Sequence, residues 1–187
     1  MRLINTQTLA LESFDDDKIP EDAILSHRWE EGEVLFEDAR NGYPTEKQGY
    51  AKICNSTRQA QRDGLRYIWV DTCCINKDSS SELSEAINSM YAWYKNSKQC
   101  YAYLSDVHLP LNEAGVGKSF GQSAWFTRGW TLQELIAPSK VDFFDCSWRY
   151  IGTKFSLQPW ITAATGMEMR ALDSLYLNTY SVAQRMA

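Results

Sequence analysis

Apolar residues recur with two different periods along the chain, and the alternation between these periods predicts strands and helices in turn. Four short apolar runs have the length and composition of buried strands: residues 23–26, 65–70, 100–104 and 141–144. Helical spacing predicts a helix over residues 46–63, which Gly64 closes, and another over residues 83–94. Ser79 and Glu82 have the spacing of a capping box in front of this second helix.

The segments between these elements have weaker patterns. Residues 1–14 alternate weakly, which predicts a short edge strand or a hairpin, and the acidic residues 30–44 predict mostly loop. A proline and three glycines predict a loop over residues 107–121. Residues 148–166 predict a further helical stretch.

Strands that alternate with helices are typical of an α/β domain, so we expect a mostly parallel sheet of about four to five strands flanked by helices. In such sheets ligands bind beyond the carboxyl ends of the strands. Polar side chains follow three of the predicted strands, at residues 26–29, at Asp71 and at residues 105–106. The pattern therefore predicts that these side chains share one rim of the sheet.

Residues 123–138 hold two tryptophans and a single carboxylate in an otherwise mostly apolar stretch. Thr127 is a suitable N-cap, and Pro138 disfavours helix at the residue before it, so we expect a short helix between them. On such a helix Trp130 and Glu134 lie four residues apart and share a face. A carboxylate in these surroundings is costly to bury, so the presence of Glu134 requires an explanation.

Composition narrows the function classes. The chain has 187 residues, 44% of them hydrophobic and 23% charged, which suits one globular domain. The net charge of -5 and the scattered basic residues argue against a nucleic-acid footprint. No apolar run approaches the roughly 20 residues of a membrane span, and the first residues lack a secretory signal. Five cysteines without a CxxC motif predict reduced thiols and a cytoplasmic location.

Five blocks of sequence, taken together, closely resemble the fungal HET (heterokaryon incompatibility) domain. The blocks are AILSHRW at 23–29, GLRYIWVDTCCINK at 64–77, SELSEAINSMYAWY at 81–94, CYAYLSDV at 100–107 and WFTRGWTLQELIAP at 125–138. The resemblance implies one HET domain over residues 1–187, with a core at about 20–150 and a helical extension at about 151–187. In this family the sequence usually continues, so we expect further protein after Ala187.

A second, remote resemblance is to TIR domains. Ile24 to Arg28 is similar to their first strand, Asp71 takes the place of the acid that ends their second strand, and Trp130-x-x-x-Glu134-Leu resembles a later short helix. The resemblance implies a TIR-like (flavodoxin-like) fold. It also implies that Glu134 is catalytic in splitting NAD+ at the nicotinamide–ribose bond, with NAD+ as substrate and neither a bound cofactor nor a metal.

The chemistry of that reaction suits a single acid. Nicotinamide in NAD+ is a cationic leaving group, so one carboxylate that stabilises the oxocarbenium character of the ribose can suffice. Trp130 would exclude water from the site. The substrate-binding candidates lie at the strand ends, with Arg28 for the pyrophosphate, Trp29 for a ring, Asp71 for a ribose hydroxyl, and Ser26 and His27 beside them.

Other interpretations remain open from the residues alone. Glu134 can be a structural helix carboxylate paired with Arg128, and Arg28 can be the ion-pair partner of the acidic 30–38 loop. Cys73 or Cys74 with His27 would form a thiol–imidazole pair of a cysteine hydrolase, although buried structural thiols are more common.

Two functions from different classes follow from the resemblances. The first is an NAD+ glycohydrolase that causes regulated cell death in fungal nonself recognition, switched on by self-association. The second is a non-enzymatic adaptor that signals cell death through contact with another HET or TIR-like protein. Only the first requires Glu134.

Overall fold

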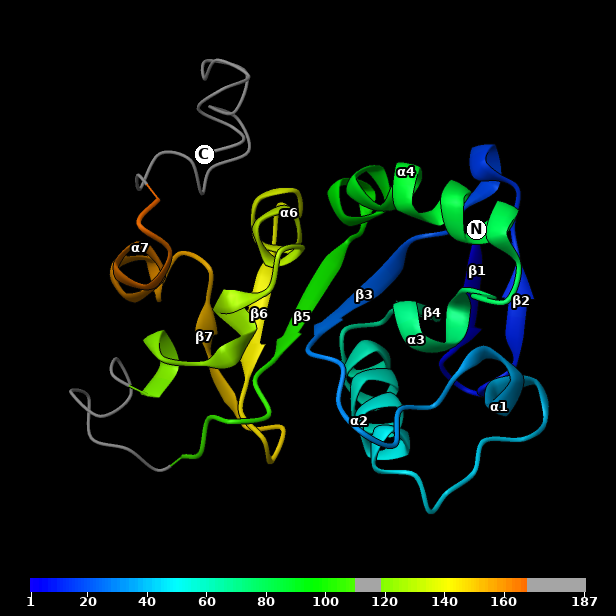
Figure 1. The fold of residues 1–187 in the computed structure, drawn as a ribbon, viewed down its shortest axis with the longest axis horizontal. Helices are drawn as coiled ribbons and strands as arrows, with labels where there is room; N and C mark the ends of the chain where they lie inside the picture. The colour runs from blue at the N-terminus through cyan, green and yellow to red at the C-terminus, as the bar shows by residue number, and fades with distance from the viewer. Residues whose placement is uncertain (110–118, 168–187) are drawn as a thin grey trace.

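The computed structural model describes residues 1–109 and 119–167, and in them the chain forms a mixed sheet covered by helices on both faces (Figure 1). The strand order is β2-β1-β4-β3-β5-β6-β7. The strands are β1 (Arg2–Asn5), β2 (Leu11–Ser13), β3 (Asp22–His27), β4 (Tyr67–Val70), β5 (Gln99–Tyr103), β6 (Val141–Phe144) and β7 (Tyr150–Thr153).

The four central strands β4, β3, β5 and β6 are parallel, and β2, β1 and β7 pair antiparallel at the two sides. The predicted α/β class with a mostly parallel sheet is confirmed, and the four predicted strands are the parallel ones. The extra strands come from the weakly patterned flanks. The first hairpin was foreseen, but its strand β1 lies inside the sheet, against β4, and only β2 is at the edge.

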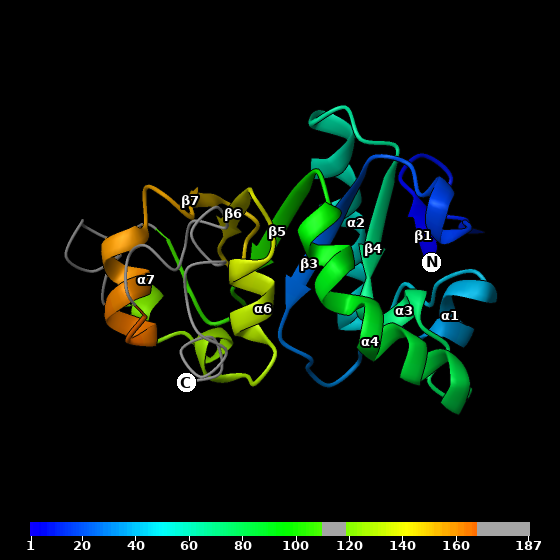
Figure 2. The ribbon, with the colours of Figure 1, turned by 90° about the horizontal axis from the view of Figure 1, so that it is seen from above.

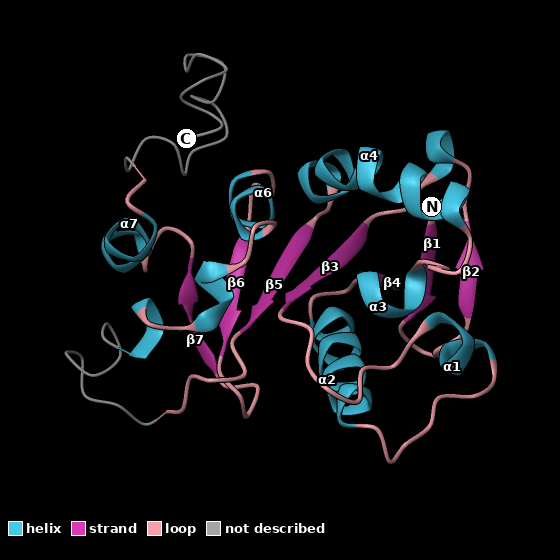
Figure 3. Cartoon of the chain, viewed as in Figure 1, coloured by secondary structure: helices cyan, strands magenta, loops and turns pink. Residues whose placement is uncertain are grey.

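The helices are α1 (Phe36–Arg40), α2 (Gln48–Arg62), α3 (Asp71–Cys74), α4 (Ser80–Asn96), α6 (Thr131–Ile136) and α7 (Gln158–Thr165), with 3-10 turns η1 (Asp16–Lys18) and η2 (Ala124–Thr127). Helices α4 and α6 lie side by side on one face of the sheet, and α2 covers the other (Figures 2 and 3). The central parallel strands are therefore covered on both faces, which is why they read as continuous apolar runs.

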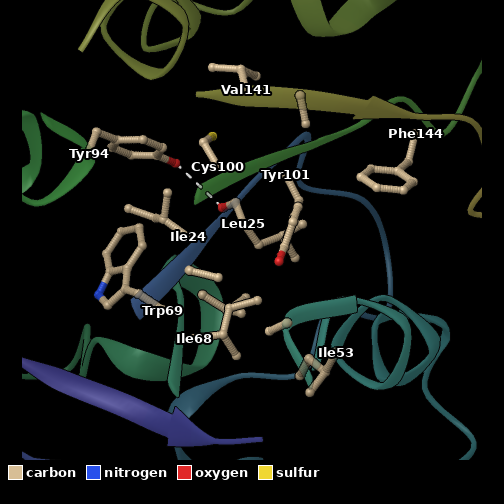
Figure 4. Packing of buried hydrophobic residues seen from close by; sticks show 14 of the residues in the cluster. Ile24, Leu25, Ile53, Ile68, Trp69, Tyr94, Cys100, Tyr101, Val141 and Phe144 are labelled. Atoms are coloured by element: carbon tan, nitrogen blue, oxygen red, sulfur yellow. Dashed lines mark hydrogen bonds between the residues drawn. The ribbon is translucent and has the colours of Figure 1, made fainter. Parts of the chain in front are cut away.

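The core follows this layering. Ile24 and Trp69 face α4, where Tyr94 donates a hydrogen bond of 3.4 Å to the carbonyl of Leu25, whereas Ile53 of α2 packs on the opposite side of the sheet (Figure 4). All six residues of β3 are buried. Strand β3 is thus the central element, and its carboxyl end is enclosed by neighbours from both faces.

One prediction of local structure is wrong. Residues 148–166 do not form one helix, because residues 150–153 pair with β6 as β7 before α7 begins. The turn between β6 and β7 is held by Asp145, whose carboxylate accepts the backbone N–H groups of Ser147 and Arg149. Residues 30–44 are mostly loop, as predicted, and the short helix α1 lies within them.

Other local predictions are confirmed. Ser79 is the N-cap of α4 and accepts a hydrogen bond from the backbone of Glu82, which is one half of the predicted capping box. The other half does not form, because the Glu82 carboxylate accepts the backbone N–H of Asn76 instead. Gly64 follows α2 with a positive φ of 77°, where glycine is favoured. The middle of the 107–121 loop and the distal part of the predicted 151–187 extension lie outside the described residues.

Candidate functional site

Glu134 lies on α6 with only 3% of its surface exposed. The helix begins later than predicted. Thr127 ends the 3-10 turn η2, Trp130 is the N-cap of α6, and Thr131 Oγ1 anchors the first turn by donating to the carbonyl of Trp125 at 2.5 Å. This arrangement turns Glu134 toward β3 rather than toward solvent.

A chain of hydrogen bonds joins the carboxylate to β3. The indole Nε1 of Trp125 donates to Ser26 Oγ at 2.8 Å, and the Ser26 hydroxyl donates to Glu134 Oε2 at 2.5 Å. Arg128 Nη1 lies 3.4 Å from the same carboxylate oxygen and also donates to the backbone carbonyl of His27. An indole, a hydroxyl and a guanidinium thus fix one acid at the carboxyl end of a central parallel strand.

Burial and the neighbouring polar groups shift the pKa of Glu134 in opposite directions, and burial has the larger effect. Burial raises the pKa of Glu134, and although the positive charge of Arg128 and the Ser26 hydrogen bond oppose that effect, the pKa stays above its usual range. Asp71 adds a negative charge that raises the pKa further. Enclosed acids with a raised pKa are enriched at functional sites, although structural ion pairs produce them too.

His27 lies on the other face of β3 from Ser26, since neighbouring strand residues point to opposite faces. Its side chain is buried, with Nε2 3.6 Å from Glu33 Oε2 and Nδ1 3.8 Å from Asp71 Oδ1. Both distances exceed a hydrogen bond, and neither ring nitrogen has a hydrogen-bond partner among the described residues. The imidazole is therefore held between two carboxylates without bonding to either.

The acidic loop after β3 is tied to α2 by Lys52. Its ammonium pairs with Glu33 and, at 2.9 Å, with Glu30, and it donates to the backbone carbonyl of Arg28 at 3.1 Å. Gly49 permits this close packing, because a Cβ there would lie 2.8 Å from the Glu33 backbone. Lys52, and not Arg28, is thus the cation that pairs with Glu30 and Glu33 in this loop.

Arg28 and Trp29 leave the sheet at the rim. The Arg28 side chain is exposed, as its predicted role at a pyrophosphate requires. Trp29 is 40% exposed, yet its indole Nε1 donates to Asp71 Oδ2 at 2.7 Å, and Lys77 Nζ lies 3.0 Å from its ring centroid. Asp71, at the start of α3, therefore connects Trp29 with His27.

Trp130 does not enclose the acid. As the N-cap residue it is 47% exposed, and its backbone carbonyl accepts the Glu134 N–H at 3.2 Å. The indole that reaches Glu134 through Ser26 is Trp125, which is 1% exposed. Spacing along one helix could not reveal Trp125, because it belongs to η2 and contacts β3 across 99 residues of sequence.

Ser26, His27, Asp71 and Glu134 thus converge at one end of the sheet. Arg128, weighed from the sequence only as a structural partner, and Trp125 belong to the same cluster. A cavity of about 220 Å³ lies elsewhere, against β1 and α4, with Trp69, Glu82 and Trp93 among its lining residues. No residue of the Glu134 cluster lines that cavity.

The cysteines do not support thiol chemistry at this site. Cys73 is fully buried in α3, where a hydrogen bond with Cys74 and burial raise its pKa, and its thiol points to the carbonyl of Val70 at 3.8 Å. A thiol–imidazole contact of 2.9 Å does occur between Cys146 and His108, in the loops near β6. In the described parts of the chain, no three potential ligands gather to hold a metal ion.

No helix within residues 1–109 and 119–167 has both the length and the apolar character needed to traverse a lipid bilayer.

Comparisons with known proteins agree with the resemblance. The family described as "Heterokaryon incompatibility protein (HET)" matches residues 23–116, which include Ser26, His27 and Asp71 but not Glu134. The vegetative incompatibility protein HET-E-1 of Podospora anserina is 48% identical over 176 residues, 91% of this chain. The match spans only 13% of the length of that protein. No solved structure matches the chain.

Proposed function

The chain belongs to the heterokaryon incompatibility (HET) family, and from that premise we propose that it is a cytoplasmic cell-death module of nonself recognition that hydrolyses NAD+ to nicotinamide and ADP-ribose. The name of the relative HET-E-1 supports the incompatibility role. The observation that carries the enzymatic part is the convergence of a buried acid, Glu134, with the predicted substrate residues at the carboxyl ends of β3 and β4. Ligands of parallel sheets bind at such ends.

The proposed mechanism needs one carboxylate. As the nicotinamide–ribose bond breaks, the leaving group becomes neutral and positive charge develops on the ribose. Glu134 would stabilise this charge electrostatically, in a site that excludes bulk water, where such an interaction is strong. One water molecule that enters with the substrate would then add to the anomeric carbon of the ribose and lose a proton to solvent, which completes ADP-ribose. The hydrogen bond from Ser26 keeps the acid oriented and favours its ionised form, and in the closed structure the charge of Arg128 adds to this effect.

Access to Glu134 requires a local rearrangement, because the acid is only 3% exposed. We propose that self-association displaces Arg128 from Glu134 and opens the carboxylate to the ribose. Gly129 lies between η2 and α6, and the conformational freedom of glycine at this position would allow the segment that carries Arg128 to turn. Arg28, exposed at the same rim, would then meet the pyrophosphate.

The test is NAD+ turnover by the wild-type chain and by Glu134→Gln, which removes the charge but keeps a side chain of the same size. We expect turnover to be lost, with the thermal unfolding midpoint within a few degrees of wild type. Glu82→Gln is the matched control, since Glu82 is a paired carboxylate outside the site that bonds Arg2 at 2.7 Å. A wild-type chain that leaves NAD+ intact even at high protein concentration would refute the enzyme.

A non-enzymatic adaptor is the second candidate, and one observation favours it. Glu134 is buried and paired with Arg128. Large apolar side chains are exposed on α6 and on the neighbouring helix α4: Trp130 and Leu132 at α6, and Ile87 and Tyr91 on α4. An exposed apolar surface of this kind is typical of a protein contact. Equal toxicity of wild type and Glu134→Gln in cells would favour the adaptor.

A further inference from the structure

Trp29 is an exposed tryptophan whose position is fixed. Its indole N–H is bound by Asp71 Oδ2 at 2.7 Å, and Asp71 begins α3, an element that is otherwise buried. Asp71 in turn faces the buried ring of His27 at 3.8 Å. A surface indole with these supports has lost most of its rotamer freedom before any ligand arrives, which favours binding.

One ring face of Trp29 already carries a positive charge. Lys77 Nζ lies 3.0 Å from the ring centroid and has no hydrogen-bond partner among the described residues. The ammonium is attracted to the ring and also to the nearby charge of Asp71. Because this ammonium is buried while Trp29 is still 40% exposed, we infer that the ring face opposite Lys77 is the one available to a ligand.

The charge of Lys77 on one face of the Trp29 ring affects which kind of ligand ring binds on the opposite face. Any flat aromatic ring of a ligand can stack on the free face of an indole. On that face the ammonium of Lys77 repels a second cation across the thickness of the ring, while the Asp71 carboxylate at the indole edge attracts it. Lys77 therefore lowers the affinity of this face for a cationic ring and leaves that for a neutral ring unchanged. NAD+ contains one ring of each kind, the neutral adenine and the cationic nicotinamide.

We propose that the free face of Trp29 binds the adenine ring of NAD+ and that Lys77 disfavours the nicotinamide ring at that position. The nicotinamide end is then directed toward Glu134, which is joined to the same rim by its hydrogen bond from Ser26 and by Arg128, which also donates to the His27 carbonyl. This assignment rests on the proposed function for the identity of the ligand. It gives the two ends of the substrate separate positions and so fixes its orientation.

The experiment uses two probes that lack the scissile bond, AMP and the cation 1-methylnicotinamide, titrated into the chain of residues 1–187 by calorimetry or ligand-detected NMR. For AMP we expect the affinity to fall about tenfold in Trp29→Ala, because a base–indole stack is lost. Trp29→Phe keeps a flat ring and is expected to retain most of the affinity. Trp130→Ala is the matched control on the second exposed indole and should leave AMP binding unchanged.

Lys77→Met removes the charge and keeps the chain length. We expect it to raise the affinity for 1-methylnicotinamide several-fold and to leave AMP binding within about twofold. AMP affinity that is the same in wild type and Trp29→Ala would overturn the adenine assignment. An unchanged preference between the two probes in Lys77→Met would overturn the role of the lysine. Unfolding curves of every variant exclude loss of the fold.

The two proposals fail separately. AMP binding that depends on Trp29, in a protein that leaves NAD+ intact, would remove the hydrolase and keep an adenine-nucleotide site. NAD+ hydrolysis with the same KM in wild type and Trp29→Ala would keep the hydrolase and remove the adenine site.

Discussion

Ser26 and His27 are neighbours on β3, yet they lead to two buried glutamates in opposite electrostatic states. On the α6 face Ser26 meets Glu134, whose pKa burial raises above its usual range. On the α2 face His27 meets Glu33, where the effect of burial is outweighed by His27 and Lys52, so that the pKa falls to about 2. At the carboxyl end of β3, the cost of burying the charge is thus outweighed by neighbouring positive charges for Glu33 but not for Glu134.

The difference indicates what each acid is for. Glu33 is held by a buried lysine and packs against Gly49, so its charge stabilises the fold. Among the residues that the structure describes, Glu134 has one ion pair, of 3.4 Å with Arg128, and its charge is costly in the folded state. An acid retained against its local cost is a better candidate for function than an acid that supports the fold.

The largest effect is expected from Lys52→Met, which tests whether Glu33 belongs to the fold. It leaves Glu33 buried with one partner fewer, and we expect a loss of about 3–5 kcal/mol in the free energy of unfolding at pH 7. Chemical denaturation measures it. Lys98→Met removes an exposed ion pair with Glu21 and should change stability little. Equal effects of the two variants would contradict the comparison.

We expect the second largest loss of stability from Glu33→Gln. The lowering of its pKa from 4.5 to about 2 corresponds to about 3 kcal/mol, which the ionised side chain contributes to stability. Because the folded pKa is depressed, this contribution is present above pH 4.5 and is lost as the pH falls toward about 2. Unfolding curves at several pH values should therefore show wild type and variant converging in acid. A constant difference across this range would argue against the linkage.

Trp125→Phe tests the support of Glu134. The variant keeps an aromatic ring against Phe143 but removes the donor to Ser26 Oγ. A lost buried hydrogen bond predicts a decrease of about 1–2 kcal/mol in stability. NAD+ turnover, if the enzyme proposal holds, should fall more than stability accounts for. Trp160→Phe, a partly buried tryptophan of α7 away from the site, serves as the control.

Glu134→Gln should have the smallest effect on stability, with the opposite sign to Glu33→Gln. The folded pKa of Glu134 is raised, so its ionised form is disfavoured in the folded state, and the wild type gains stability as the pH falls through that pKa toward 4.5. We expect the variant to be as stable as wild type at pH 7, or more stable by on the order of 1 kcal/mol. A large loss of stability in Glu134→Gln would make Glu134 structural, like Glu33.

The sequence predicted secondary structure correctly where an apolar run or a helical period of apolar residues marks a buried element. The runs 23–26, 65–70, 100–104 and 141–144 became the parallel strands, and the helix over 46–63 became α2. Strand β7 was missed because its pairing depends on the Asp145 turn and on Gly152, where a Cβ would lie 2.7 Å from Ser156 Oγ. Neither feature produces a period in the sequence.

The candidate site was predicted in part. The carboxyl ends of parallel strands meet at one edge, so the shared position of Ser26 and Asp71 followed from the order of the elements. The pairing of Arg128 with Glu134 was considered from the sequence only as a structural alternative, and the structure contains it. Trp125 was not foreseen as a partner of Ser26, because this contact depends on where η2 turns into α6. Similarly, nothing in the spacing of Lys52 indicated that it neutralises Glu33.

The sequence by itself determined the α/β order, the parallel strands and the rim where polar side chains gather. The hydrophobic period is a local property of the chain, and strands that alternate with helices form a parallel sheet. Only the tertiary structure decided the electrostatic state of each acid at that rim. A pKa depends on burial and on charges brought close by folding, and those neighbours, Lys52 for Glu33 and Arg128 for Glu134, are set by packing across the two faces of the sheet.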